Sequence, residues 1–326
     1  MKTSLKAKAL DLSTLWILLV LLVFFGIFGN GFLTVSNVST ILNQASFLVL
    51  IGVSQMIAML VGEINISIGA CMALSTVACG AWLSKKSDVF VLLPILVVLC
   101  MGGLVGLFNG IASTKLRIPA FLATYAVMYM ARGTSWLIIG KGVIYGVRPD
   151  IRALANTEIL TIGSFRLTAP MLVALIFAVA MWFILSKTNF GRRLYFTGSN
   201  RTAAEFSGIN VKRMIVTAHV FSGAVAGFAA IMYVGRLNAI DAALGGSYHF
   251  DAITVSLIGG TLMRGGKGNV WSVLCGAVIV ATIQAGMNNM QVSSEMQDAF
   301  LGILIILAVF LNNYLEKRKM ALNQND

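Results

Sequence analysis

The stretch GEINISIG places a carboxylate, an amide and a hydroxyl at alternate positions, Glu63, Asn65 and Ser67. Glu63 is the only charged residue between Asp11 and Lys85, so it stands alone between two long apolar runs. An uncompensated carboxylate in hydrocarbon costs at least several kcal/mol, so Glu63 needs water, a helix end or a polar partner. We expect the three side chains to line a solute path or its gate, or else to lie in an ordinary turn between two helices.

No second acid, histidine or cysteine joins Glu63 at a catalytic or metal-binding spacing. His219 and His249 lie far apart in the sequence, and neither has a cysteine or carboxylate at metal spacing. His219 is typical of a packed residue that hydrogen-bonds across helices, with a functional role as the alternative. The four cysteines all sit in apolar runs, where they are typical of packing residues. We therefore do not expect catalysis or a bound metal in this chain.

A glycine-rich stretch, GGTLMRGGKGN at 259–269, superficially resembles a phosphate-binding loop. The motif requires Ser or Thr after its lysine, but Gly268 follows Lys267 here. Thr261 also stands where the motif requires its first glycine. The stretch better suits a tight cytoplasmic turn, so any ATP hydrolysis belongs to another chain.

The elements that position these residues are predicted by composition. Of the 326 residues, 58% are hydrophobic and 11% are charged, and the mean hydropathy is +0.88. Soluble domains carry about 25% charged residues. The apolar runs have the roughly 20 residues that cross a bilayer as a helix, whereas barrel strands have about 10 alternating residues. The fold class is therefore all-α, as a single polytopic transmembrane domain over 1–326, and membrane lipid is its solvent.

Charge-free runs bounded by Gly, Pro and Asn indicate about ten transmembrane helices. The N-terminus resembles a signal peptide, but no A-x-A cleavage site follows, so we predict a first transmembrane helix there. The predicted spans are 12–29, 43–61, 66–84, 90–113, 118–139, 168–186, 213–235, 250–263, 269–289 and 296–315.

Loop charges predict the orientation. If ten spans alternate, sixteen lysines and arginines fall on the side of the termini and seven on the other side. The positive-inside rule then places both termini in the cytoplasm, and it explains the net charge of +12 without nucleic acid. The loop 140–167 is predicted to be external, and 187–212 is predicted to be cytoplasmic. Within the latter, NRTAAEFSGIN predicts a short amphipathic helix, capped by Ser199 or Asn200 and ended by Gly208.

Two segments, near 62–69 and 245–263, are predicted to be broken or re-entrant. Only twelve residues separate Asp251 from Arg264, too few to cross the bilayer as a helix. Either the helix starts earlier and buries Asp251, with His249 as a further candidate, or it is broken. Broken helices are tolerated at membrane depth where they line a cavity.

Other polar residues inside the spans complete a tentative substrate path. Most amides in membrane helices hydrogen-bond neighbouring helices, so each of these residues has a packing alternative. Arg132 could instead reach the outer interface. With the three residues of the first stretch, the predicted path comprises Glu63, Asn65, Ser67, Gln55, Asn109, Arg132, Asp251 and Asn288. Two runs of small residues, GGLVGLFNG at 102–110 and SGAVAGFAA at 222–230, are typical of helix-packing faces and hint at two halves.

Four segments together resemble, in order, the permeases of ribose-type ABC sugar importers. They are GEINISIGA (62–70), LRIPAFLATYAVMYMARG (116–133), TNFGRRLYFTGSNRTAAEFSGINVKR (188–213) and DAITVSLIGGTLMRGGKGNVW (251–271). The family pattern has Asp, Leu and Ser where this chain has Asn65, Ile66 and Ala70, so a carboxylate role at 65 is not available.

The resemblance implies a permease of the bacterial inner membrane that carries a monosaccharide, a pentose or a hexose. It implies a partner ATPase, separate or a fused tandem, which binds ATP and magnesium, so that this chain binds no cofactor. It also implies an extracytoplasmic sugar-binding protein and a second permease, usually an identical copy. In such importers the helix of the cytoplasmic loop couples the ATPase to the membrane helices. Here that role falls on Gly198, Asn200, Arg201, Ala204, Glu205 and Gly208.

Two rival functions come from other classes. A secondary transporter could couple a small polar solute to protons through Glu63 or Asp251, although no second acid lies near Glu63 in the sequence. The other rival is a passive channel or a structural membrane subunit. Uptake that collapses with an uncoupler while ATP is maintained would favour the proton-coupled transporter. Energy-dependent accumulation against a gradient would exclude a passive channel.

Overall fold

The computed structural model describes residues 13–29, 31–84, 89–140 and 142–323. Several lysines used in the charge argument lie outside the described residues, namely Lys2, Lys6, Lys8, Lys85, Lys86 and Lys141.

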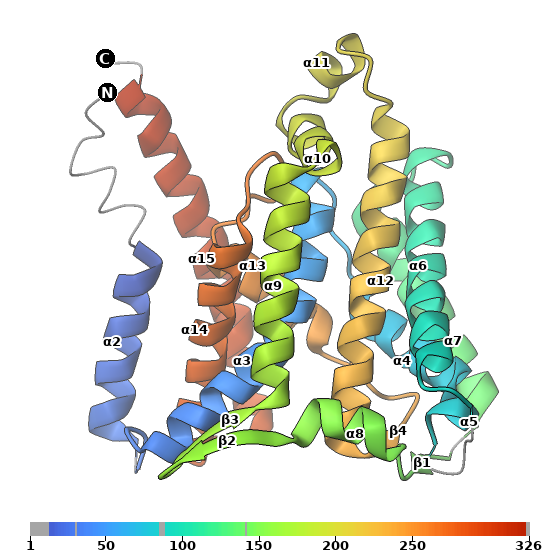
Figure 1. The fold of residues 1–326 in the computed structure, drawn as a ribbon. Helices are drawn as coiled ribbons and strands as arrows, with labels where there is room; N and C mark the ends of the chain where they lie inside the picture. The colour runs from blue at the N-terminus through green and yellow to red at the C-terminus, as the bar shows by residue number, and fades with distance from the viewer. Residues whose placement is uncertain (1–12, 30, 85–88, 141, 324–326) are drawn as a thin grey trace.

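The described part is a bundle of helices, most of which run along the long axis of the molecule (Figure 1). Five of its helices are long and apolar enough to cross a membrane: α3 (Val35–Leu60), α6 (Leu92–Thr114), α9 (Ala169–Lys187), α12 (Val211–Leu237) and α14 (Val270–Asn289). The other helices of the bundle are α2 (Ser13–Phe28), α4 (Ile68–Ala78), α5 (Gly80–Leu83), α7 (Ala120–Ile139), α13 (Tyr248–Ile258) and α15 (Ser294–Asn323).

Each predicted span coincides with a helix, and most boundaries agree within a few residues. The second span was predicted to begin at 43, but α3 begins at Val35. Thr34 explains the earlier start, because its hydroxyl accepts a hydrogen bond from the amide of Asn37 at 3.3 Å and caps the helix. The third predicted span is divided between α4 and α5, with Cys79 between them.

The connecting segments lie at the two ends of the bundle (Figure 1). The helices α10 (Asn189–Ser199) and α11 (Arg201–Phe206) lie at one end, called here the α11 end. The opposite end, called here the hairpin end, carries α8 and two small antiparallel sheets, β1 with β4 and β2 with β3. The described part is mostly helical, as predicted, and these four short strands, three of them in the loop 140–167, were not predicted. The elements are β1 (Ile144–Tyr145), α8 (Pro149–Asn156), β2 (Glu158–Ile162), β3 (Phe165–Thr168) and β4 (Ala239–Ile240).

The two runs of small residues pack against each other, on α6 and α12. A Cβ atom at Gly102 would lie 2.2 Å from the carbonyl oxygen of Gly223, and one at Gly106 would lie 2.1 Å from that of His219. The two backbones can approach this closely only because glycine has no side chain. The prediction of packing faces at 102–110 and 222–230 is confirmed.

Two helices, α4 and α13, have 11 residues each and so extend about 16 Å, roughly half of a hydrocarbon core. Each follows a non-helical segment, 61–67 at the α11 end and 238–247 at the hairpin end. The segments approach from opposite ends and meet where Gly69 touches Gly245, since a Cβ at Gly69 would lie 1.9 Å from the Gly245 carbonyl oxygen. Of the two possibilities predicted for 245–263, the structure shows the earlier helix start: α13 begins at Tyr248 and buries both His249 and Asp251, and the non-helical stretch lies before it, at 238–247.

Candidate solute path and coupling site

Glu63 lies in the segment 61–67, immediately after α3, and is only 7% exposed. Its Oε1 accepts a hydrogen bond from Nη2 of Arg201 at 2.6 Å. The same guanidinium nitrogen donates to the carbonyl oxygen of Val61 at 3.0 Å. Arg201 is the first residue of α11, so this ion pair joins α11 directly to the segment between α3 and α4.

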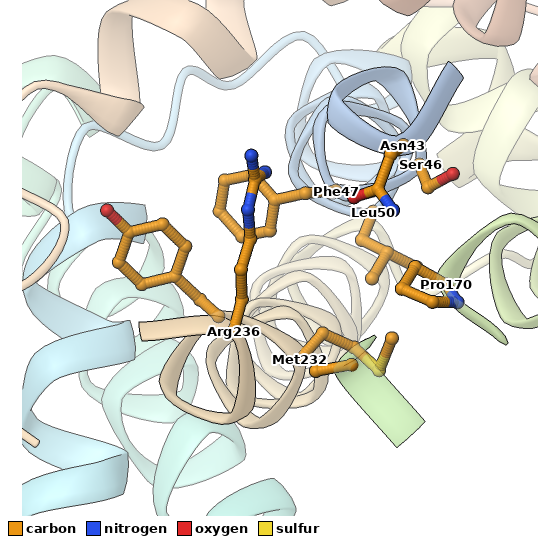
Figure 2. Close-up of a pocket in the computed structure, with 9 residues that line it drawn as sticks. Asn43, Ser46, Phe47, Leu50, Pro170, Met232 and Arg236 are labelled. Atoms are coloured by element: carbon orange, nitrogen blue, oxygen red, sulfur yellow. The ribbon is translucent and has the colours of Figure 1, made fainter. Parts of the chain in front are cut away.

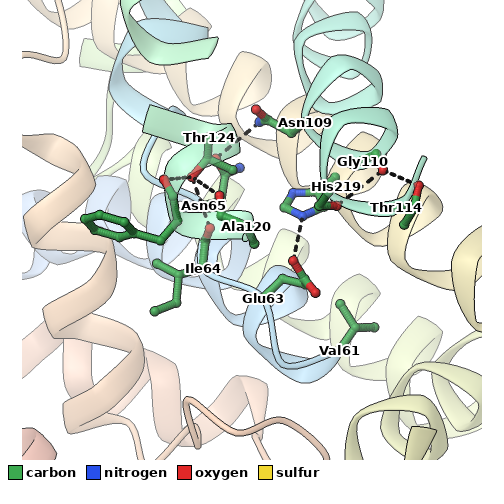
Figure 3. A network of polar contacts seen from close by, with 12 residues as sticks. Val61, Glu63, Ile64, Asn65, Asn109, Gly110, Thr114, Ala120, Thr124 and His219 are labelled. Atoms are coloured by element: carbon green, nitrogen blue, oxygen red, sulfur yellow. Dashed lines mark hydrogen bonds and ion pairs between the residues drawn. The ribbon is translucent and has the colours of Figure 1, made fainter. Parts of the chain in front are cut away.

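His219 lies on the other side of Glu63, on α12, and is fully buried (Figure 3). Its Nε2 is 3.9 Å from Oε2 of Glu63, which is too long for a hydrogen bond but close enough for an electrostatic contact. Glu63 therefore lies between a side chain of α11 and a side chain of the membrane helix α12.

Asn65, Ser67 and Asn109 form a buried cluster of hydrogen bonds (Figure 3). Oδ1 of Asn65 accepts from the hydroxyl and the amide of Ser67, at 2.8 and 3.0 Å. Nδ2 of Asn109, from α6, donates to the hydroxyl of Ser67 at 2.7 Å. Nδ2 of Asn65 donates to the hydroxyl of Ser222, on α12, at 3.0 Å. The cluster fastens the segment 61–67 to two membrane helices.

Thr124 fastens the same segment to a third helix, α7. Its hydroxyl accepts from the amide of Ile66 and donates to the carbonyl oxygen of Ile64, both at 3.2 Å (Figure 3). Buried backbone groups outside a helix need such partners. The non-helical segment is thus held by side chains of α6, α7 and α12, and a movement of α11 would act on it through Glu63.

Helix α10 and the turn 259–268 pack on the same end of α3. The amide of Gly266 donates to the carbonyl oxygen of Leu60 at 2.9 Å. Gly198 of α10 lies so close that a Cβ there would be 1.8 Å from the same oxygen. The Tyr195 hydroxyl donates to the carbonyl oxygen of Gly268 at 2.9 Å, and burial raises the pKa of this phenol, which keeps it protonated. The predicted tight turn is therefore part of the contact with α10.

The predicted coupling residues are divided between α10 and α11, with Gly198 in α10 rather than in the short helix. Asn200 caps α11 by accepting from the amide of Ala203 at 3.0 Å, and Gly208 follows the helix at a φ of +77°. Ala204 is buried and Glu205 is exposed. Sequence reasoning did not single out Phe206, whose side chain is 89% exposed at the tip of α11.

In the described part of the chain, the remaining path residues make no hydrogen bond to this cluster. Gln55 is fully buried on α3, and among the described residues its side chain has no hydrogen-bond partner. Asp251 is buried and accepts from Nε2 of Gln284 at 3.0 Å. Arg132 is exposed on α7, and Asn288 is exposed and accepts from Nε2 of Gln297 at 2.8 Å.

Ser222 and the Arg201–Glu63 contact were not predicted as parts of one site. No spacing in the sequence relates residues more than a hundred positions apart, and the only signal for Ser222 was a hydroxyl within a small-residue face. In the part of the chain that the structure describes, no group of three or more His, Cys, Asp or Glu side chains is placed to hold a metal ion.

A bundle of apolar helices with two broken segments that meet inside it defines a membrane transport protein. The model of one family, described as a branched-chain amino acid transport system permease component, matches residues 37–309, and the chain belongs to this family. It is a multi-pass membrane permease.

Curated relatives cover nearly the whole chain. The D-allose transport system permease protein of Escherichia coli K12 is 33% identical, over 93% of this chain and 92% of the relative. The ribose import permease protein of Haemophilus influenzae is 31% identical, over 93% of each chain. The fructose import permease protein of Rhizobium meliloti is 28% identical, over 92% of this chain and 84% of the relative. No solved structure matches the chain.

Proposed function

We propose that this chain is the membrane-spanning permease of an ATP-binding-cassette importer that carries a monosaccharide into the cytoplasm. Sugar permeases for allose, ribose, fructose and galactose match it over nearly its full length. The family description names branched-chain amino acids, so an amino acid is the substrate class to test against sugars. The chain itself is proposed to bind no cofactor, while ATP and magnesium bind to the partner ATPase.

The proposed topology has ten spans with both termini in the cytoplasm. In Figure 1, the beginning of α2 and the end of α15 point toward the α11 end. The basic loop 187–212 lies at that end too, as expected for cytoplasmic loops. The short helices α4 and α13 complete their crossings with the non-helical segments 61–67 and 238–247.

The observation that carries the mechanism is the ion pair between Arg201 and Glu63. We place the ATPase against α11, where Phe206 is exposed and offers an aromatic anchor. ATP-driven closure of the ATPase would move α10 and α11, and these helices contact the end of α3 through Gly198 and the segment 61–67 through Arg201. The hydrogen-bonded cluster of Asn65, Ser67 and Asn109 would rearrange with that segment and open or close the path.

The proposed partners follow from the two ends of the molecule. A pair of ATPase domains, or one fused tandem ATPase, binds at the α11 end, and a sugar-binding protein docks at the hairpin end. A second copy of the permease, or a similar one, completes the path across the membrane. The binding protein provides most of the affinity, which suits a path built from scattered amides and hydroxyls.

The test is reconstitution of the permease, its ATPase and its sugar-binding protein in liposomes. We expect accumulation of one of ribose, allose, fructose or galactose, and ATPase activity that the loaded binding protein stimulates. Replacing residues 200–208 with a Gly-Ser linker should abolish stimulation and accumulation and leave sugar binding by the binding protein intact. Stimulation that survives this replacement would sink the coupling proposal.

Two control arms address the alternatives. Uptake of leucine in place of sugars would contradict the proposed substrate class. Uptake that collapses with an uncoupler while ATP is maintained would favour the proton-coupled secondary transporter.

A further inference from the structure

A cavity of about 430 Å³ opens at the hairpin end of the molecule. It lies between the end of α12, the strands β1 and β4, and the start of α13, with the segment 241–247 forming much of its wall. Its volume falls within the roughly 300–1,000 Å³ of small-molecule sites. Two other cavities, one of them shown in Figure 2, measure about 20 and 10 Å³, which suits at most a water molecule.

One wall of the large cavity is aromatic. The hydroxyl of Tyr248 donates to that of Tyr233 at 2.6 Å, and the two ring centroids are 5.0 Å apart. The ring of Phe47, on α3, lies 5.0 Å from each of them. Tyr233 lines both the large cavity and the small pocket of Figure 2, and Phe47, which lines only the small pocket, packs against both tyrosine rings from behind.

Polar groups lie beside the aromatic wall. Asp241 uses Oδ1 to accept from the amide of Ala243 at 3.0 Å, and among the described residues no cation lies within ion-pair distance of this carboxylate. Ser247 is exposed at the start of α13, and its hydroxyl does not cap the helix. The carboxylate of Asp241, the hydroxyl of Ser247 and the hydroxyl of Tyr248 can therefore hydrogen-bond a ligand.

We infer that this cavity is the reception site for a monosaccharide released at the outer face of the permease. The C–H faces of a sugar ring pack on tyrosine rings, and the sugar hydroxyls hydrogen-bond the carboxylate and hydroxyl groups beside them. A free amino acid is a poorer fit, because none of the described residues that line the cavity is a cation that could pair with its carboxylate. The inference rests on the proposed function, since it names residues that would receive its substrate.

The cavity lies close to the helix that follows the segment 61–67. Gly245 lines it and touches Gly69, the second residue of α4, where the two broken segments meet. A sugar in the cavity would thus lie against the segment 238–247, and the segment 61–67 would lie beyond the contact of the two glycines. In this arrangement the sugar is received at the segment 238–247, and the ATPase acts on the segment 61–67.

The test uses cysteine protection in liposomes that contain the full transporter. Ser247→Cys is introduced after the four native cysteines have been replaced with alanine, and its labelling by a membrane-impermeant maleimide is measured with ribose, allose, fructose, galactose or leucine. We expect the sugar that the transporter accumulates to protect position 247 at millimolar concentration. Thr161→Cys, on an exposed hairpin at the same end, is the control and should stay unprotected.

Conservative variants sharpen this test. Tyr248→Phe or Asp241→Asn should raise the sugar concentration for half-protection about tenfold, as expected for one lost hydrogen bond. Tyr125→Phe is the matched control, because Tyr125 and Tyr129 form another hydrogen-bonded pair, at 3.2 Å with ring centroids 5.0 Å apart, outside this cavity.

The outcomes separate the two proposals. Failure of every sugar to accumulate would contradict the proposed function. The reception site alone would be overturned if the transporter accumulated a sugar that does not protect position 247. It would also be overturned if position 161 were protected equally, if leucine protected position 247, or if the two variants left the sugar concentration for half-protection unchanged.

Discussion

Glu63 and Arg201 form an ion pair, although the sequence analysis assigned them to different sites. Glu63 was predicted to belong to the solute path or to a turn, and Arg201 to the coupling helix. Their 2.6 Å contact makes Glu63 a partner of α11, the helix that we propose to couple the ATPase to the membrane helices. The carboxylate is buried, whereas the side chain of Arg201 is 48% exposed, so loss of the arginine leaves a charge with little water around it.

We predict that Glu63→Gln and Arg201→Gln each lower sugar accumulation about tenfold, because about 1.4 kcal/mol of coupling is lost with the ion pair. The double variant should be no worse than either single variant, since both remove the same interaction. Accumulation and stimulated ATPase activity in liposomes measure the effect.

The pair Glu158–Arg166 provides the control for this cycle. It has a contact of 2.8 Å but is exposed at the hairpin end, where an ion pair contributes about 0–1 kcal/mol. Glu158→Gln with Arg166→Gln should therefore leave accumulation unchanged. Additive losses in the Glu63 and Arg201 cycle would contradict a direct coupling through the pair.

Asn65 departs from the aspartate of the family pattern, and its contacts explain how an amide serves there. It accepts from Ser67 through its oxygen and donates to Ser222 through its nitrogen. An ionised carboxylate could not donate to Ser222 and would need the serine hydroxyl to reverse its bond. The amide holds the segment in place without a second charge near Glu63.

At the scale of elements, helix α4 and the segment 238–247 depend on glycine where they meet. The contact between Gly69 and Gly245 brings two backbones together inside the bundle. A methyl group at position 69 would overlap the Gly245 carbonyl oxygen, and backbone cannot move aside as a flexible side chain can.

We predict that Gly69→Ala destabilises the permease by about 1–3 kcal/mol and abolishes sugar accumulation, because α4 must move away from the segment 238–247. Thermal unfolding of the purified complex and uptake in liposomes measure the two effects. Gly133→Ala, in α7, is the matched control, since a Cβ there meets nothing within 4 Å and alanine favours a helix by roughly 0.5–1 kcal/mol. Equal behaviour of the two variants would show that the close approach has no such role.

At the scale of the whole molecule, the two ends differ in charge and structure. The α11 end carries the basic loop with α10 and α11, and the hairpin end carries the small sheets and the large cavity. This polarity suits an importer that receives solute at one face and couples to an ATPase at the other.

Cysteine labelling tests the orientation. In a chain whose native cysteines are replaced with alanine, Thr161→Cys should react with a membrane-impermeant maleimide in intact cells whose outer barrier is opened. Ser207→Cys, exposed after α11, should react only after the inner membrane is permeabilised. Reaction in the reverse order would overturn the proposed placement of the termini, because the basic loop would then face outward.

The sequence by itself determined the helical membrane class, the approximate positions of the long helices and the packing faces of α6 and α12. These properties follow from local composition: twenty apolar residues require a helix in lipid, and a run of small residues permits close packing. The capping of α11 by Asn200 followed from the same local chemistry. Strand β1 was missed because it pairs with β4, almost a hundred residues away. The hairpin of β2 and β3 is local, and it was missed although its two strands are adjacent in the chain.

The tertiary structure alone decided which polar residues share a site. It joined Glu63 to Arg201, placed Ser222 beside Asn65, and left Arg132 and Asn288 apart from them. It also built the large cavity from residues that include three tyrosines and an aspartate, none of which a motif marks. These contacts depend on how helices distant in the chain cross one another. Hydrophobic periodicity reports only the environment of each single helix, so it does not predict which helices cross or which of their side chains meet.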